Sequence, residues 1–354
     1  MIDKRSNGSE NNAARLLRCY GDGNGASFET YDEGIILKGI GGFYYVLINR
    51  SIAECKARGI FRKTKITPLA GDRVSVRINS ETEAGTFGVI EKIHSRKNCL
   101  ERPPAANIDI LFAVISVMLP SPDLMLLDKI LVSAVEKGIE AAVCINKIDL
   151  DDGSNAEKIA SAYRKAGYPV IFLDSVAEDY CHGKGYLELE TLLKGKKAIL
   201  AGQSGAGKSS IINNILKAEK MDIGELSIKT GRGRHTTRHV ELIPLRKNGF
   251  IIDTPGFSLY EPDLDEASSL KEYFPEIAAL EGRCRFTGCS HSGEPGCSAE
   301  QELLKGNIDS GRYERYKKMY EELTKKQKSY GRQETGKQQT AGRERTQSDK
   351  KGWS

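Results

Sequence analysis

The chain has 354 residues, of which 39% are hydrophobic and 29% are charged, and its formal net charge is +5. This length allows two or three domains with cores of their own, and the composition excludes a fibrous or wholly disordered protein. The start of the chain has no apolar run, which excludes a secretory signal. The longest apolar stretch, Ile110 to Leu119, is too short to cross a bilayer. We therefore expect a cytoplasmic protein that does not contact membranes.

Both ends of the chain are polar. Between Lys325 and Lys351 there are nine Lys or Arg residues against three Asp or Glu residues, so this segment alone exceeds the positive surplus of the whole chain. Its low apolar content predicts a basic, disordered tail over residues 327–354. Residues 1–30 predict a flexible leader, with a short helix near Ala13 to Cys19.

Short apolar runs alternate with turn residues between residues 31 and 98, and this spacing predicts a small β-barrel or sandwich. Within this region, the segment from Lys56 to Lys63 combines several cations with Phe61. Such a mixture suits a surface for single-stranded nucleic acid or ribosomal RNA, which OB-fold barrels provide. A strand with a simply solvated outer face is the alternative. The expected strands are 35–37, 43–48, 74–78 and 87–93.

Strands alternate with helices between residues 99 and 262, which predicts an α/β domain with a parallel, doubly wound sheet. Residues 263–326 are polar and helical, and we expect them to end in a helix near Arg312 to Lys326. The expected strands of the sheet are 108–117, 141–145, 170–173, 197–201 and 250–252, and the expected helices are 124–137, 156–166 and 209–216.

A complete phosphate-binding loop pattern lies between an expected strand and an expected helix. Its glycines allow successive backbone N–H groups to turn toward phosphates, and the N-terminus of the following helix favours negative charge. We expect Lys208 to bridge the β- and γ-phosphates and Ser209 to hold Mg²⁺. The motif consists of Gly202, Gln203, Ser204, Gly205, Ala206, Gly207, Lys208 and Ser209.

The segment Asn146-Lys147-Ile148-Asp149 follows the expected strand 141–145, at the edge where a doubly wound sheet binds its ligand. The Asp149 carboxylate can accept hydrogen bonds from guanine N1–H and from the 2-amino group, a pairing that adenine lacks. The stem of Lys147 would cover the ring, and Asn146 would brace the loop. A surface loop is the alternative for this motif. The backbone at Ser175, just past the strand 170–173, is a weaker candidate for a contact with guanine O6.

Two further segments predict the switches of a GTPase. Asp253 would reach Mg²⁺ through water, and the N–H of Gly256 would contact the γ-phosphate. The loop from Gly231 to His239 would bring Thr236 or Thr237 to the Mg²⁺, with His235 near the γ-phosphate; a basic loop that contacts RNA is the alternative, and the two are compatible.

The order of the motifs is unusual. The base-reading segment at Asn146 precedes the phosphate-binding loop at Gly202, whereas common small GTPases place it last, so the order indicates a circular permutation. Phe257 stands where many GTPases carry a Gln that orients the attacking water, and Phe cannot hydrogen-bond water. We therefore expect slow intrinsic hydrolysis that a partner stimulates.

Three cysteines and one histidine cluster within fourteen residues near the C-terminus. Three thiolates and an imidazole match a closed, four-coordinate structural zinc site. Disulfides are the alternative, which a reducing compartment disfavours. The candidate ligands are Cys284, Cys289, His291 and Cys297.

Together, these residues closely resemble the bacterial ribosome small-subunit-dependent GTPase A family. The resemblance runs from about Tyr31 to Lys326 and rests on ordered matches in every region. It implies an OB-fold, a circularly permuted GTPase domain and a zinc-binding C-terminal domain. It also implies a late maturation factor of the 30S subunit whose hydrolysis of GTP to GDP is stimulated by the subunit and accompanies release from it. We expect a monomer that binds the 16S rRNA of this subunit. The matching segments are 42–44, 55–59, 68–72, Asn146 to Asp149, Gly202 to Ser210, 233–237, Asp253 to Gly256 and Cys284 to Cys297.

Three functional hypotheses follow. The first is a GTP hydrolase that times a step on ribosomal RNA. The second is a nucleotide-dependent rRNA-binding module in which hydrolysis is incidental, with Phe257 marking lost catalysis. The third, a permuted GTPase that acts on the large subunit, is disfavoured by the added barrel and the cysteine cluster.

Overall fold

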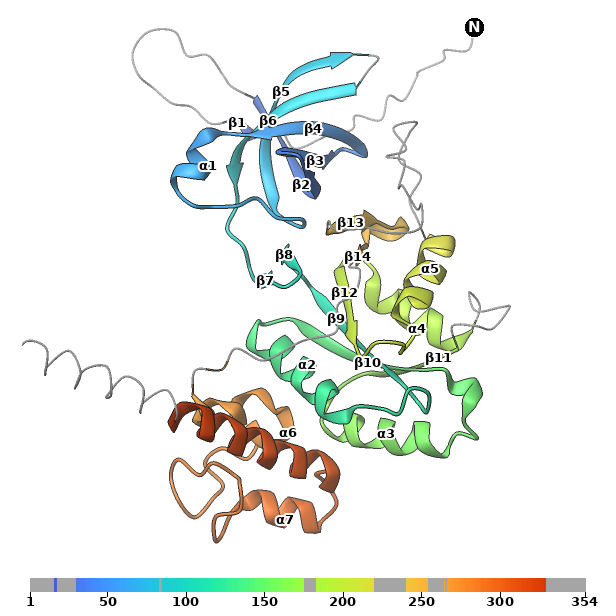
Figure 1. Ribbon diagram of the computed structural model, residues 1–354, viewed down its shortest axis with the longest axis vertical. Coiled ribbons are helices and arrows are strands. Elements are labelled where there is room, and N and C mark those ends of the chain that lie inside the picture. The colour runs from blue at the N-terminus through green and yellow to red at the C-terminus, as the bar shows by residue number, and fades with distance from the viewer. Residues whose placement is uncertain are drawn as a thin grey trace, which may run out of the picture. The chain divides into compact units, whose positions relative to one another are not determined.

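The computed structural model describes residues 16–17, 30–82, 85–174, 183–219, 240–253, 264 and 266–328 (Figure 1). Contacts divide the chain into two compact units, one comprising residues 1–109, 192–199 and 215–257 and the other residues 110–191, 200–214 and 258–354. In the described ranges, we find no helix with the length and apolar character that a membrane span requires. Most of the predicted basic tail and most of the predicted leader lie outside the described residues, while residues 327 and 328 belong to the last helix.

A closed barrel forms the N-terminal part. Its sheet order is β1-β2-β3-β4-β6-β5, and β5 also pairs with β2, which closes the ring. All neighbours in the ring are antiparallel except β4 and β6, which run parallel, and the connection from β4 to β5 carries the short helix α1 (Gly59–Lys63). This arrangement is that of an OB-like barrel. The strands are β1 (Leu16–Leu17), β2 (Thr30–Ile40), β3 (Phe43–Ile48), β4 (Ser51–Ala57), β5 (Arg73–Thr82) and β6 (Gly85–Ile93).

Alternating apolar residues fill the barrel interior, as the period of a strand requires. Ile36, Val46, Val74 and Val76 are fully buried there. The predicted helix near Ala13 to Cys19 is wrong at its centre, because Leu16 and Leu17 form strand β1 on the edge of β2. Strand β4 was not predicted, because a Glu and a Lys interrupt its apolar run.

The second sheet has the strand order β11-β10-β9-β12-β14-β13. The predicted strands pair parallel, as in β10 with β9, β10 with β11 and β12 with β14, whereas β13, which was not predicted, pairs antiparallel with β14 at the edge. The central strand β9 is buried along its whole length, as strands covered on both faces must be. The strands are β9 (Ile110–Ser116), β10 (Glu140–Asn146), β11 (Val170–Leu173), β12 (Lys197–Gly202), β13 (Glu241–Pro244) and β14 (Phe250–Asp253).

Helices connect these strands, and hydrogen bonds show which helices are neighbours. Tyr163 of α3 donates to Asp128 of α2 at 2.9 Å, and Asn214 of α5 donates to the hydroxyl of Tyr186 in α4 at 3.1 Å. Helix α4 was not predicted from sequence, whereas the other three lie within two or three residues of their predicted bounds. The helices are α2 (Leu124–Glu136), α3 (Ser154–Lys165), α4 (Lys184–Leu193) and α5 (Lys208–Glu219), with η1 (Ile148–Leu150) and η3 (Arg246–Asn248) between strands and a small β7 (Cys99–Glu101) and β8 (Pro104–Ala106) pair before β9.

The C-terminal part consists of η4 (Ala267–Tyr273), α6 (Pro275–Ala278), α7 (Ser298–Leu304) and a helix over residues 310–328. Arg312 of the last helix is almost fully buried and forms ion pairs with Asp128 of α2 and with Glu276. Its guanidinium also lies 4.7 Å from the ring centre of Phe274. A buried charge is tolerated only when it is paired, so this cluster fixes the last helix against α2.

Candidate nucleotide-binding site and metal centre

The predicted phosphate-binding loop connects the end of β12 with the start of α5. Gly202 has φ +146°, and a Cβ atom there would lie 1.9 Å from the backbone oxygen of Val114, so only glycine fits. Gly205 and Gly207 also have positive φ values, of +77° and +97°. These residues curl the backbone around the N-terminus of a twelve-residue helix, which is the geometry of an anion-binding loop.

Lys208 lies at the centre of this loop. Its Nζ atom donates to the carbonyl oxygens of Gly202 at 2.7 Å and of Gln203 at 2.8 Å. Burial lowers the pKa of Lys208, so a neighbouring anion would stabilise its charged form. Ser209 and Ser210 are exposed in the first turn of α5. The loop therefore presents an ammonium and a hydroxyl at the same helix end, as phosphate and Mg²⁺ binding require.

The Asn146 to Asp149 segment meets this loop directly. Asn146 is fully buried at the end of β10, and its Nδ2 donates to the backbone oxygen of Ala206 at 2.9 Å. Lys147 has φ +64°, which turns the chain, and Asp149 is exposed in η1 just beyond it. The structure thus brings the base-reading and phosphate-binding motifs together from positions sixty residues apart.

A third element of the site, the loop between β9 and α2, was not predicted from sequence. Lys147 Nζ donates to the carbonyl oxygen of Leu119 at 2.7 Å. Gln203 donates to the carbonyl oxygen of Ser121 at 3.0 Å and accepts from the N–H of Asp123 at 2.9 Å. The loop therefore contacts both motifs. The sequence of this loop indicates a turn, because Pro120 and Pro122 precede the helix cap Asp123. It does not indicate that the turn contacts the two motifs.

The switch residues are described only in part. Strand β14 ends at Asp253, so the backbone of this residue lies at the carboxyl end of the sheet as predicted. The predicted contacts of other switch residues and of the guanine loop fall outside the described residues. These residues are Ser175, His235, Thr236, Thr237, Gly256 and Phe257.

The predicted zinc ligands converge on one point. One ligand atom from each of Cys284, Cys289, His291 and Cys297 lies within 4.8 Å of the other three. His291 Nδ1 is 3.4 Å from the sulfur of Cys284 and 3.5 Å from that of Cys297. A tetrahedral zinc ion with sulfur ligands needs neighbouring ligand atoms about 3.8 Å apart. The donor set and its spacing therefore fit a structural zinc ion whose four positions are all filled by protein side chains.

The local environment favours proton loss from Cys284 and His291 but opposes it at Cys289. Burial raises the pKa of Cys284, but hydrogen bonds from the hydroxyl and N–H of Ser298 outweigh this and bring its pKa below the usual value. Burial raises the pKa of Cys289 to about 12, and burial together with nearby Lys271 lowers the pKa of His291. A neutral imidazole is the form that binds a metal, and a cation would stabilise the thiolates.

The fold and site define a class. A phosphate-binding loop that touches an Asn-Lys-x-Asp segment on a mainly parallel sheet is the construction of a GTPase, and the segment's position before the loop makes the GTPase circularly permuted.

Comparisons with known proteins agree with this class. Residues 93–263 match the family model described as RsgA GTPase, and residues 33–86 match the RsgA N-terminal domain. The small ribosomal subunit biogenesis GTPase RsgA of Ruminiclostridium cellulolyticum is 45% identical over 292 residues, covering 82% of this chain and 93% of the relative. The protein of the same name from Alkaliphilus metalliredigens is 42% identical, covering 83% and 98%. The chain therefore belongs to the RsgA family of GTPases.

Solved structures show the same likeness. YloQ, described as a circularly permuted GTPase, superimposes with a TM-score of 0.69 at 35% identity over 84% of this chain and 96% of its own. YjeQ from Thermotoga maritima gives a TM-score of 0.68 at 33% identity over 83% and 99%. These matches confirm the predicted combination of an OB-like barrel and a permuted GTPase fold.

The contact between the two motifs generates the first prediction. In Asn146→Ala the carbonyl oxygen of Ala206 loses a buried donor, which costs about 1–3 kcal/mol, and we expect GDP affinity to fall about tenfold. Displacement of a fluorescent GDP analogue measures this. Asn155→Ala, which removes an exposed amide bonded to Asp151, serves as the control and should bind like the wild type. Equal affinities in all three proteins would contradict the bracing role.

Proposed function

We propose that this chain is a GTPase that binds the small ribosomal subunit and assists its late maturation, hydrolysing GTP to GDP and phosphate. The single observation that carries the nucleotide part is the hydrogen bond from Asn146 to Ala206, because it joins a base-reading segment to a phosphate-binding loop. The ribosomal part is supported by the names of the relatives, which are small ribosomal subunit biogenesis GTPases.

Roles for individual residues follow from this proposal. Asp149 reads guanine, Lys208 contacts the β- and γ-phosphates, and Ser209 binds Mg²⁺ together with Thr236 or Thr237. Asp253 and Gly256 form the second switch, and His235 acts near the γ-phosphate. The support is that Lys208 and Ser209 begin α5, while Asn146, three residues before Asp149, bonds to the loop that precedes this helix. The switch roles rest on sequence.

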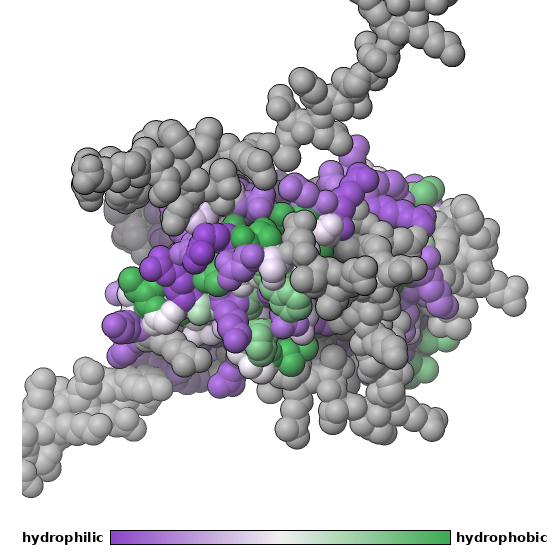
Figure 2. Space-filling model, turned by 90° about the horizontal axis from the view of Figure 1, so that it is seen from above, coloured by the Kyte–Doolittle hydropathy of each residue, from purple (hydrophilic) through white to green (hydrophobic). Residues whose placement is uncertain are grey.

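We propose further that the barrel contacts 16S rRNA. Lys56 and Arg58 are exposed, and Lys56 Nζ lies 5.0 Å from the ring centre of Phe43. Two exposed apolar side chains belong to neighbouring elements: Ile60 of α1 is 53% exposed, and Phe87 of β6, the strand that pairs with β4, is 37% exposed. The described surface seen in Figure 2 likewise mixes hydrophilic and hydrophobic patches. Cations beside flat apolar groups suit a phosphate backbone with unstacked bases. We place the protein in the cytoplasm as a monomer.

The domain limits that fit this function are the barrel at residues 31–98, the GTPase domain at 99–262 and a zinc-binding domain at 263–326. The leader at 1–30 and the basic tail at 327–354 would flank them. The zinc ion would be held by Cys284, Cys289, His291 and Cys297, and its role would be to fold the loops between α6 and α7.

The hydrolytic function predicts a specific pattern of turnover. Phosphate release from GTP should be slow for the free protein and should rise strongly, by about a hundredfold or more, when purified 30S subunits are added. ATP should give no turnover above background. Equal rates with and without 30S subunits would contradict the proposal.

Lys208→Ala distinguishes the enzyme from a binding module with incidental hydrolysis. If hydrolysis drives release, this variant should lose turnover and should remain on the 30S subunit in a sedimentation assay. Unchanged release would favour the binding module, in which Phe257 marks the loss of a catalytic Gln.

The zinc proposal has its own measurement. Metal analysis of the purified protein should find one zinc ion per chain, because four donor atoms converge on one point. Cys297→Ser should lose the ion and lower the unfolding temperature of the C-terminal part, since structural zinc contributes to folding. Cys99→Ser, a matched change outside the cluster, should retain it. A wild-type protein that contains no zinc after expression in zinc-supplemented medium would refute the site.

A further inference from the structure

Lys38 of the barrel is a buried cation with a partner from a distant part of the sequence. Its Nζ atom lies 3.1 Å from Oε1 of Glu241, the first residue of β13, and the two side chains are 6% and 21% exposed. The Nζ atom is also 5.6 Å from the ring centre of Tyr45. Burying an ammonium is costly unless an opposite charge compensates, so this pair forms only if barrel and strand adopt this arrangement.

An irregularity in β2 directs Lys38 toward this partner. The β2–β3 pairing shifts by one residue between Ile36, which lies opposite Val46, and Lys38, which lies opposite Tyr45. Residues directly opposite each other share a face of a sheet. In a regular strand, Lys38 would stand two residues after Ile36 and would share its face toward the barrel core. The bulge instead places Lys38 beside Tyr45 on the outer face, which is a common use of bulges near functional sites.

Glu241 stands where both switch segments are anchored. It is the Cα register partner of Asp253, the last residue of β14 and the first of the second switch motif. It also follows directly after the segment 220–240, which contains the Gly231 to His239 motif. Lys38 therefore holds β13 through Glu241. This strand begins just after the predicted first switch, and it pairs with Asp253, where the predicted second switch begins.

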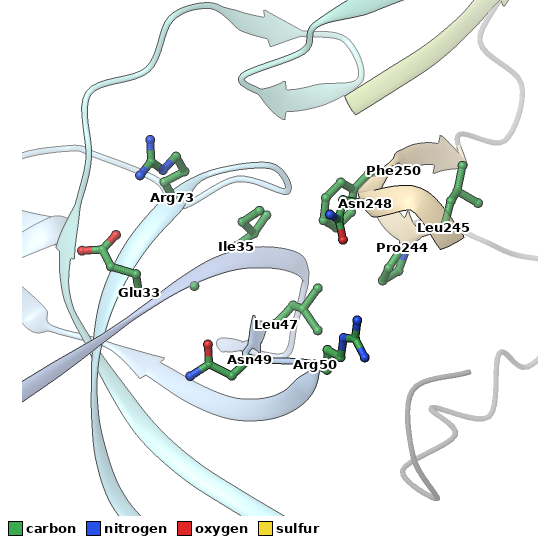
Figure 3. A pocket seen from close by; sticks show the side chains of 11 residues that line it. Glu33, Ile35, Leu47, Asn49, Arg50, Arg73, Pro244, Leu245, Asn248 and Phe250 are labelled. Atoms are coloured by element: carbon green, nitrogen blue, oxygen red, sulfur yellow. The ribbon is translucent and has the colours of Figure 1, made fainter. Parts of the chain in front are cut away.

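Elsewhere the barrel and this hairpin face each other across a cavity of about 330 Å³ (Figure 3). Ile35 and Leu47 line it from the barrel, and Pro244, Leu245 and Phe250 line it from the hairpin. Apolar side chains that line an open cavity lose part of the contacts that close packing would give. The Lys38–Glu241 ion pair is thus a specific contact between barrel and hairpin, whereas the apolar contact around the cavity is loosely packed.

We propose that Lys38 is a positioning residue that couples the barrel to the nucleotide switches, so that RNA bound to the barrel changes the affinity for the triphosphate state. The proposal deepens the function proposed above and rests on it for the identity of the RNA. Only the triphosphate state needs both switches ordered around Mg²⁺ and the γ-phosphate. A hairpin held by Lys38 has less freedom to lose when the switches become ordered, whereas GDP binding depends mainly on the phosphate-binding loop.

A double-mutant cycle tests the coupling in the free protein. We expect Lys38→Met and Glu241→Gln each to weaken binding of a non-hydrolysable GTP analogue by about fivefold or more, because allosteric coupling between two sites usually changes affinity by at least about this factor. GDP affinity should stay within about twofold of the wild type. The double variant should lose no more than either single variant, because both remove the same pair. Arg77→Met, which removes an exposed pair with Glu91 on the barrel, is the control and should match the wild type.

Each result decides the proposal. Retained GDP binding shows that the variants are folded. Analogue affinity equal to the wild type, equal losses for analogue and GDP, or additive losses in the double variant would each overturn the coupling. A parallel measurement of 30S-stimulated turnover should show reduced stimulation in Lys38→Met. If the wild type itself shows no stimulation, the proposed ribosomal function fails, while the affinity cycle still decides the role of Lys38.

Discussion

The hydrogen bond from the buried side chain of Asn146 to the backbone of Ala206 is the constraint on which the site depends. It forms because β10 and β12 end at the same edge of the sheet, so that a motif from one half of the chain touches the loop from the other. Gly202 allows this loop to pass against Val114 without a clash. A permuted chain preserves such a contact because the contact depends on the order of strands in the sheet, and not on their order in the sequence.

Permutation also changes what each switch is connected to. Strand β13 follows the segment predicted to be the first switch and pairs with β14, which leads into the predicted second switch. In this chain the pair meets the outer face of the barrel through Lys38, while Arg312 fixes the last helix against α2. Two buried cations thus tie the added parts to the α/β sheet, each through a carboxylate that would be costly to leave unpaired.

Much of this architecture could be predicted from sequence because it depends on local patterns. Apolar runs located five strands of the sheet, and the spacing of Gly202 to Ser209 and of Cys284 to Cys297 identified sites whose residues lie close together along the chain. The contact of the Asn146 to Asp149 segment with the phosphate-binding loop, made through Asn146, followed from the rule that ligands bind at the carboxyl ends of parallel strands.

The remaining features depend on tertiary contacts that no local pattern records. The bulge at Leu37 replaces the regular alternation that a strand prediction assumes, so Lys38 could be recognised only as one more charged residue. The contacts of the loop after β9 with Lys147 and Gln203 connect segments up to 82 residues apart. The antiparallel β13 is short, and its pairing is set by the hairpin with β14 and not by its own composition.

The central claim is that Asp149 and Lys208 act on the same guanine nucleotide. Replacing the Asp149 carboxylate by an amide tests this claim most directly. In Asp149→Asn the acceptor for the guanine 2-amino group becomes an amide that can donate to the 2-oxo group of xanthine. Affinities for GDP and xanthosine diphosphate, measured with Mg²⁺ by calorimetry, should therefore exchange their order between wild type and variant. An unchanged preference for GDP in the variant, or no binding of either nucleotide by the wild type, would contradict the account.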